Sequence, residues 1–218
     1  MKHPWLLAIV IVMLAPPGVG AHRLDEYLQA TRVGIERERV SLEIDLTPGV
    51  SVARQVTGWI DSDGNRVISM PESLAYGRQV LDALSLTVDG RAVSLELGNV
   101  EAPSVADIET GTGTLRLRAS AIVPSVRTGR HELTLINSHH PETSVYLANA
   151  LVPSDTSIQV LDQRRSVDQH SFTMAYDVGT PASWARAAWG LSALGLMFVT
   201  AATRRGLGRS RIHRSRPN

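Results

Sequence analysis

The stretch RVSLEIDLT, residues 39–47, indicates the fold class because its side chains alternate between apolar and polar without a break. Val40, Leu42, Ile44 and Leu46 fall on one side, and hydroxyl or acidic side chains stand between them. Successive side chains of a strand point to opposite faces of a sheet, so this period of two predicts a half-buried strand. We therefore expect a β domain whose strands each turn one face to a core.

Several other short segments of the chain have the same character. LSLTV at residues 84–88 precedes Asp89-Gly90, a dipeptide typical of a tight hairpin turn, and AVSLEL follows at 92–97. Many short strands separated by turn residues predict an antiparallel β-sandwich, so the expected fold class is mainly β. The other predicted strands lie at residues 114–122, 132–136, 144–150, 157–161 and 171–178.

One part of the chain interrupts this β pattern. Residues 51–60 and 71–84 have helical spacing, and Pro71 suits the first turn of a helix. A polar loop separates the two predicted helices. We therefore expect an EF-hand-like helix–loop–helix at residues 50–84, inserted into the sandwich.

The loop DSDGNRVISMPE, residues 61–72, has the ligand spacing of a calcium loop. Such loops place side-chain oxygens at positions 1, 3 and 5, a backbone carbonyl at 7, a direct or water-mediated ligand at 9 and a bidentate Glu at 12. Ile68 at position 8 is apolar, as in loops that pair through a short strand. The predicted calcium ligands are Asp61, Asp63, Asn65, Val67 through its carbonyl, Ser69 and Glu72.

Two features of this loop predict weak binding. Arg66 occupies position 6, where the sharp turn needs a positive φ that costs a residue other than glycine about 1 kcal/mol. The chain also has a single such loop, although these loops usually work in pairs. Ser69 and Glu72 have the spacing of a helix capping box, so a capped polar turn is the competing interpretation. For a calcium site we expect a dissociation constant of ~10⁻⁴–10⁻³ M.

The two ends of the chain predict export and membrane attachment. Residues 1–21 combine a basic start, an apolar run and small residues at 19–21, which is typical of a cleaved signal peptide, with a retained anchor as the alternative. Residues 187–203 carry no charge, and six arginines follow them. This pattern predicts a transmembrane helix at 183–203 and a basic cytoplasmic tail at 204–218.

The predicted topology is that of a single-pass type I protein of the bacterial inner membrane, with residues 22–182 as its periplasmic domain. That domain holds 14 basic and 21 acidic residues, a formal charge of −7. An acidic domain suits cations and argues against a nucleic-acid partner. The chain has no cysteine, which excludes disulfides and thiolate metal ligands.

Three stretches of the chain resemble a known family. AHRLDEYLQA at 21–30, RVSLEIDLTPGV at 39–50 and NSHHPETSVYLANAL at 137–151 are similar to segments of the exported N-terminal domain of the hydrogenase/urease accessory (HupE/UreJ-type) membrane proteins. Those domains also contain a calcium-like loop of the kind at 61–72. The resemblance extends over residues 22–178.

The resemblance implies a role in handling metal ions. Larger members of that family carry a multi-helix membrane domain associated with nickel or cobalt uptake, whereas this sequence has one predicted span. A single helix cannot enclose a transport path. The resemblance therefore implies sensing, capture or binding of a membrane partner by the outer domain.

A second kind of metal site is conceivable at the histidines. If the signal is cleaved after Ala21, the amine and imidazole of His22 could chelate Cu²⁺ or Ni²⁺, which favour nitrogen ligands. His139 and His140 could join such a site, with Asn137 and Glu142 close in sequence. The competing interpretations are a free terminus at His22 and a polar loop at the two adjacent histidines.

The sequence offers no pattern of an enzyme. It contains no Gly-x-Ser-x-Gly, no phosphate-binding loop and no HExxH, so we expect no catalytic activity. The leading hypothesis is a membrane-anchored calcium-binding accessory domain in which calcium is structural or modulatory. Its alternatives are transition-metal capture through His22 and a protein-interaction module for an envelope membrane protein.

Overall fold

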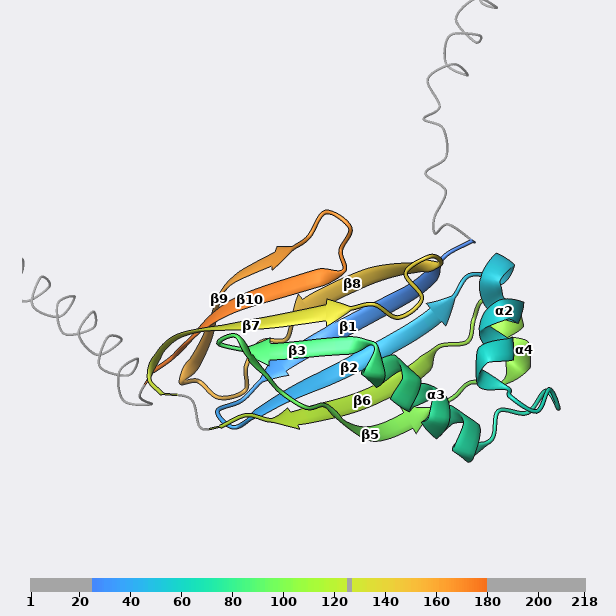
Figure 1. The fold of residues 1–218 in the computed structure, drawn as a ribbon, viewed down its shortest axis with the longest axis horizontal. Coiled ribbons are helices and arrows are strands. Elements are labelled where there is room, and N and C mark those ends of the chain that lie inside the picture. Colours follow the sequence, from blue (N-terminus) through green and yellow to red (C-terminus); the bar gives the residue numbers. More distant parts are fainter. Residues whose placement is uncertain (1–24, 125–126, 180–218) are drawn as a thin grey trace, which may run out of the picture.

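The stretch at 39–47 forms strand β2, Arg39–Pro48, and its four alternating apolar side chains are all buried. The computed structural model describes residues 25–124 and 127–179. In this part of the chain the fold is mainly β, with two five-stranded sheets whose buried side chains form one core. Figure 1 shows the sheets as two layers with the helices gathered at one end.

The two sheets divide the strands as follows. The first has the order β5-β6-β2-β1-β8 and the second the order β4-β3-β7-β10-β9. The strands of the first are β1 Tyr27–Ile35, β2, β5 Glu96–Glu101, β6 Leu115–Ile122 and β8 Ser144–Ala150, and those of the second are β3 Leu84–Val88, β4 Arg91–Ala92, β7 Gly129–Asn137, β9 Ile158–Arg165 and β10 Ser171–Val178.

The prediction of purely antiparallel sheets was wrong at one pairing. β1 and β8 run parallel, with Tyr27 opposite Ser144 and Val33 opposite Ala150. The reason lies in the connection from β7 to β8, which leaves the second sheet and joins the first beside β1. The other pairings of the described strands are antiparallel.

Two more strands differ from the sequence-based expectation. Residues 92–97 do not form one strand, because β4 ends at Ala92 in the second sheet and β5 begins at Glu96 in the first. β1 was not among the predicted strands. Its buried face includes Gln29 and Thr31 beside Tyr27. These polar side chains interrupt the alternation of apolar and polar residues from which a strand is predicted.

The helical insertion is present where the sequence placed it. α2 spans Val50–Ile60 and α3 spans Met70–Asp82, with Ala83 as the C-cap, so α3 ends slightly before the predicted residue 84. The hydroxyls of Tyr27 on β1 and Tyr76 on α3 form a buried hydrogen bond of 3.1 Å. A third helix, α4 Val105–Glu109, was not predicted from the sequence.

The predictions for the two ends fall outside the described residues. They concern the signal peptide at 1–21, His22, the span at 183–203 and the tail at 204–218. Within 25–124 and 127–179, no helix is both long and apolar enough to cross a membrane.

The two glycines within α2 and α3 give a stability test of how α3 packs. A Cβ on Gly77 of α3 would lie 3.0, 3.1 and 3.3 Å from side-chain atoms of Val100, Leu97 and Leu117, whereas a Cβ on exposed Gly58 of α2 meets nothing within 4 Å. We expect Gly58→Ala to stabilise the fold by about 0.5–1 kcal/mol through helix propensity. Gly77→Val should destabilise it by about 1–3 kcal/mol through overpacking. Urea unfolding of both variants measures this, and equal effects would contradict the packing of α3 on β5 and β6.

Candidate metal centre

The loop between α2 and α3 brings three acidic side chains together. Asp61, Asp63 and Glu72 each offer a carboxylate oxygen, and these oxygens lie within 4.8 Å of one another. In the described part of the chain, no other three His, Asp or Glu side chains gather in this way. Calcium–oxygen distances of about 2.3–2.6 Å place ligands on opposite sides of an ion about 5 Å apart. The three oxygens are therefore close enough to share one ion.

Asp61 is the buried member of this group, with 7% of its surface exposed. Its Oδ2 accepts a hydrogen bond of 2.8 Å from the backbone N–H of Arg66. Its Oδ1 is buried and has no hydrogen-bond partner. A buried, unpaired carboxylate oxygen is energetically costly, and such atoms are rare in folded proteins. A cation bound beside Asp63 and Glu72 would compensate this oxygen.

The polar side chains of the loop shape its backbone. Asp63 Oδ1 accepts from the N–H of Asn65 at 3.0 Å, and Asn65 Oδ1 accepts from the N–H of Val67 at 2.7 Å. The Asn65 amide also donates to Asp63 Oδ2 at 2.7 Å. Both Gly64 and Arg66 have positive φ, 70° and 66°, which curls the chain tightly. The side chain of Asn65 thus forms hydrogen bonds within the loop, whereas the side chain of Val67 is exposed to solvent.

Glu72 joins the start of the loop to its end. Its Oε1 accepts from the backbone N–H groups of Ser62 and Asp63 at 2.7 and 3.3 Å, and from the Ser62 hydroxyl. Its Oε2 accepts from the N–H and the hydroxyl of Ser69 at 2.9 and 2.7 Å. These bonds, led by that from the Ser69 N–H, lower the pKa of Glu72 to about 2. The carboxylate is therefore ionised at neutral pH.

The capping box predicted at Ser69 and Glu72 is confirmed. Ser69 is the N-cap of α3, its hydroxyl accepts from the N–H of Glu72, and Glu72 returns a bond to the Ser69 N–H. The capped turn and the group of acidic oxygens therefore occur together, and the two interpretations of the sequence do not exclude each other.

Arg66 adopts the left-handed conformation that the sequence predicts to be unfavourable. Its guanidinium makes two hydrogen bonds to the carboxylate of Glu109 on α4, with lengths of 3.2 and 2.9 Å. Sequence reasoning missed Glu109, because it lies far along the chain in an unpredicted helix.

The end of α2 is tied to the connection between β7 and β8. Trp59 stacks on His140, with ring centroids 3.6 Å apart and planes 4° apart. His140 has a φ of 52°, and its Nδ1 lies 3.4 Å from Glu142 Oε1. The turn that carries the two adjacent histidines therefore contacts α2 two residues before Asp61.

His139 is a structural histidine of this turn. Its backbone carbonyl accepts hydrogen bonds from Gln29, Ser144 and Tyr146, and its N–H donates to Asn137. Its imidazole is buried, which lowers its pKa to about 4. Its Nε2 has no hydrogen-bond partner, yet the two histidines and Glu142 do not form a three-ligand group. The predicted site at His22 lies outside the described residues.

No protein-family model matches the chain, and no curated protein matches it.

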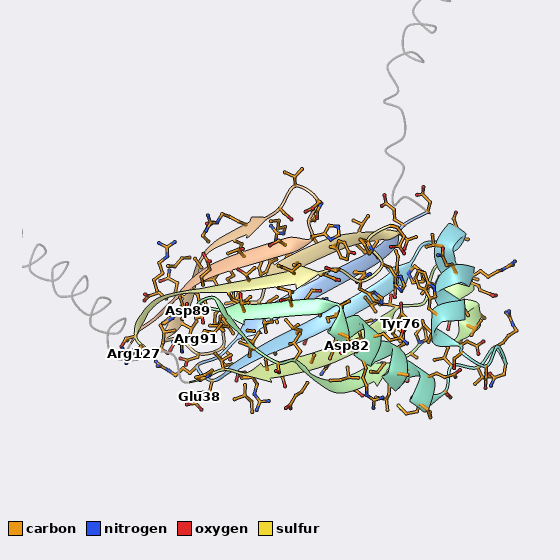
Figure 2. All side chains as sticks on the ribbon, viewed as in Figure 1. Glu38, Tyr76, Asp82, Asp89, Arg91 and Arg127 are labelled. Carbon is orange, nitrogen blue, oxygen red and sulfur yellow. The ribbon has the colours of Figure 1, made fainter. Side chains whose placement is uncertain are left out.

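The pKa of Glu72 predicts how stability changes with pH. The folded-state pKa of about 2 lies below the ordinary value of 4.5, so the stabilisation is present above about pH 5 and is lost as the pH falls toward 2. We expect the difference in melting temperature between wild type and Glu72→Gln, measured in chelator, to be largest above pH 5 and to shrink below pH 4. Glu38→Gln removes an exposed carboxylate at the other end of the sandwich (Figure 2) and serves as the control. A difference that stays constant with pH would contradict the role of the ionised carboxylate.

Proposed function

We propose that residues 22–182 form an extracytoplasmic calcium-binding domain, anchored to the bacterial inner membrane by residues 183–203. The observation that carries this proposal is that Asp61 has a buried Oδ1 without a hydrogen-bond partner and that its carboxylate groups with those of Asp63 and Glu72. Calcium, a hard cation that binds oxygen ligands, fits a site without sulfur or nitrogen donors.

The proposed calcium ligands are the residues at positions 1, 3, 5, 7, 9 and 12 of the EF-hand-like loop. Asp61, Asp63 and Glu72 supply carboxylate oxygens, and Asn65, the Val67 carbonyl and Ser69 complete the coordination. In the described structure the oxygens of Glu72 accept hydrogen bonds from Ser62, Asp63 and Ser69. Binding calcium with both oxygens must replace or weaken part of these bonds. This competition supports a dissociation constant in the weak range of ~10⁻⁴–10⁻³ M.

Calcium in this position has a structural or modulatory role. An ion held by Asp61 at the end of α2 and by Glu72 in the first turn of α3 fixes one helix relative to the other. α2 in turn contacts the β7–β8 connection through the stack of Trp59 on His140. Calcium would therefore stabilise residues 50–84 and, through Trp59, the adjoining turn of the sandwich.

Two of the three stretches that resemble the exported domain of HupE/UreJ-type proteins contact each other in the structure. Residues 27–30 of one stretch pair with residues 144–147 of the other, because β1 and β8 are neighbouring strands. Each stretch has one residue against Trp59 of α2: the ring centroid of Tyr27 lies 6.2 Å from that of Trp59, and the ring centroid of His140 lies 3.6 Å from it. Parts of these two stretches thus adjoin the helix that leads into the proposed calcium loop, and together with the resemblance this is the basis for a role of the region linked to nickel or cobalt handling.

The geometry also supports an orientation relative to the membrane. The described chain ends at Gly179, whose carbonyl accepts from Arg37 in the β1–β2 connection. This end of the sandwich lies opposite the helices (Figure 1). With residues 183–203 in the bilayer, the calcium loop faces away from it, toward a soluble partner or the outer part of a large membrane protein. A partner of this kind would co-purify with the full chain.

Calcium titration of the purified chain tests the proposed function. We expect saturable binding of one equivalent by calorimetry and, at about 10 mM calcium, stabilisation by about 1.5–3 kcal/mol for a dissociation constant of ~10⁻⁴–10⁻³ M. Asp61→Asn should abolish both effects because it removes the buried charge. Asp82→Asn changes an exposed carboxylate at the far end of α3 and should bind like the wild type. Absence of binding by the wild type, or unchanged binding by Asp61→Asn, would refute the proposal.

A further inference from the structure

Position 6 of the loop presents a physical difficulty. The backbone N–H of Arg66 donates to Asp61 Oδ2, so the residue is part of the turn that surrounds the carboxylates. A glycine would supply this turn without strain and without charge. Arginine is always protonated in proteins and is a natural partner of carboxylates. A free guanidinium here would compete with a metal ion for Asp61 and Asp63.

In the structure the charge of Arg66 is paired with a carboxylate. The guanidinium of Arg66 pairs with Glu109 through Nη1 to Oε1 and Nη2 to Oε2, at 3.2 and 2.9 Å. This fork-to-fork geometry fixes the direction of the side chain as well as its charge. The side chain of Arg66 is 65% exposed, so it extends outward from the loop.

Glu109 lies on a short helix, α4, that is packed against the rest of the domain. It is the last residue of α4, whose N-cap Ser104 accepts from the N–H of Asp107 and whose Val105 and Ile108 are buried. α4 packs against α2, the helix that ends at the loop. The carboxylate of Glu109 is therefore held at a defined place beside the loop.

We propose that Glu109 is a positioning residue of the calcium site, which holds the Arg66 guanidinium outside the group of Asp61, Asp63 and Glu72. This inference rests on the proposed function. By neutralising Arg66 and directing it to α4, Glu109 leaves the carboxylates available to a divalent cation. α4 thus contributes to the site without providing a ligand, and the arginine at position 6 becomes compatible with binding.

A double-mutant cycle on the full chain tests this role by calorimetric titration with calcium chloride. Glu109→Gln keeps the shape of the side chain and removes its charge, so Arg66 is released toward Asp61 and Asp63. We expect calcium affinity to fall about five-fold, and the loss to shrink at high salt because exposed charges are screened. Arg66→Gln, which keeps the strained backbone but removes the cation, should restore the affinity of Glu109→Gln to the wild-type level or above.

The outcomes separate this inference from the proposed function. A wild type that binds no calcium overturns the proposed function and this inference with it. A wild type that binds calcium, with Glu109→Gln binding equally well, overturns the positioning role alone. A loss in Glu109→Gln that Arg66→Gln does not restore also overturns it, because a purely structural effect of α4 is not rescued by removing a charge on the loop.

Discussion

The buried carboxylate of Asp61 is the constraint around which the helical end of the molecule is arranged. Burying an ionised group is costly unless hydrogen bonds or an opposite charge compensate it. The structure supplies one compensation, the Arg66 N–H to Oδ2, and leaves Oδ1 without a protein partner. The left-handed turn at Arg66 follows from this bond, because it directs the N–H toward Asp61. The strained backbone of Arg66 and the burial of the Asp61 carboxylate therefore depend on the same hydrogen bond.

The sandwich provides the rigid frame for this arrangement. α3 is tied to β1 by the buried hydroxyl pair of Tyr27 and Tyr76, and α2 to the β7–β8 turn by Trp59 and His140. That turn is itself fixed by the hydrogen bonds of the His139 carbonyl. The loop therefore connects two helices that are each fixed by contacts with the sandwich. A cation shared by Asp61 and Glu72 would act on the angle between these helices rather than on the sheets.

Features that depend on interactions between residues close in sequence were predictable, and features that depend on contacts between distant residues were not. The strand at 39–47, the capping box of Ser69 and Glu72 and the two helices depend on local periodicity and spacing, and the structure has them. β1 escaped prediction because Gln29 on its buried face is satisfied by Asn137 and the His139 carbonyl, partners more than a hundred residues away. The parallel pairing of β8 and the contact of Glu109 with Arg66 also depend on tertiary structure, which spacing along the chain does not encode.

A crystal structure determined with calcium would show directly whether an ion binds beside Asp61. With calcium present during crystallisation and its anomalous scattering recorded, we expect an ion about 2.3–2.6 Å from Asp61 Oδ1, with oxygens of Asp63 and Glu72 among its other ligands. If Oδ1 instead accepts a hydrogen bond from water or protein and no ion is in the loop at millimolar calcium, Asp61 is not a calcium ligand. The loop would then be a capped turn that connects two helices.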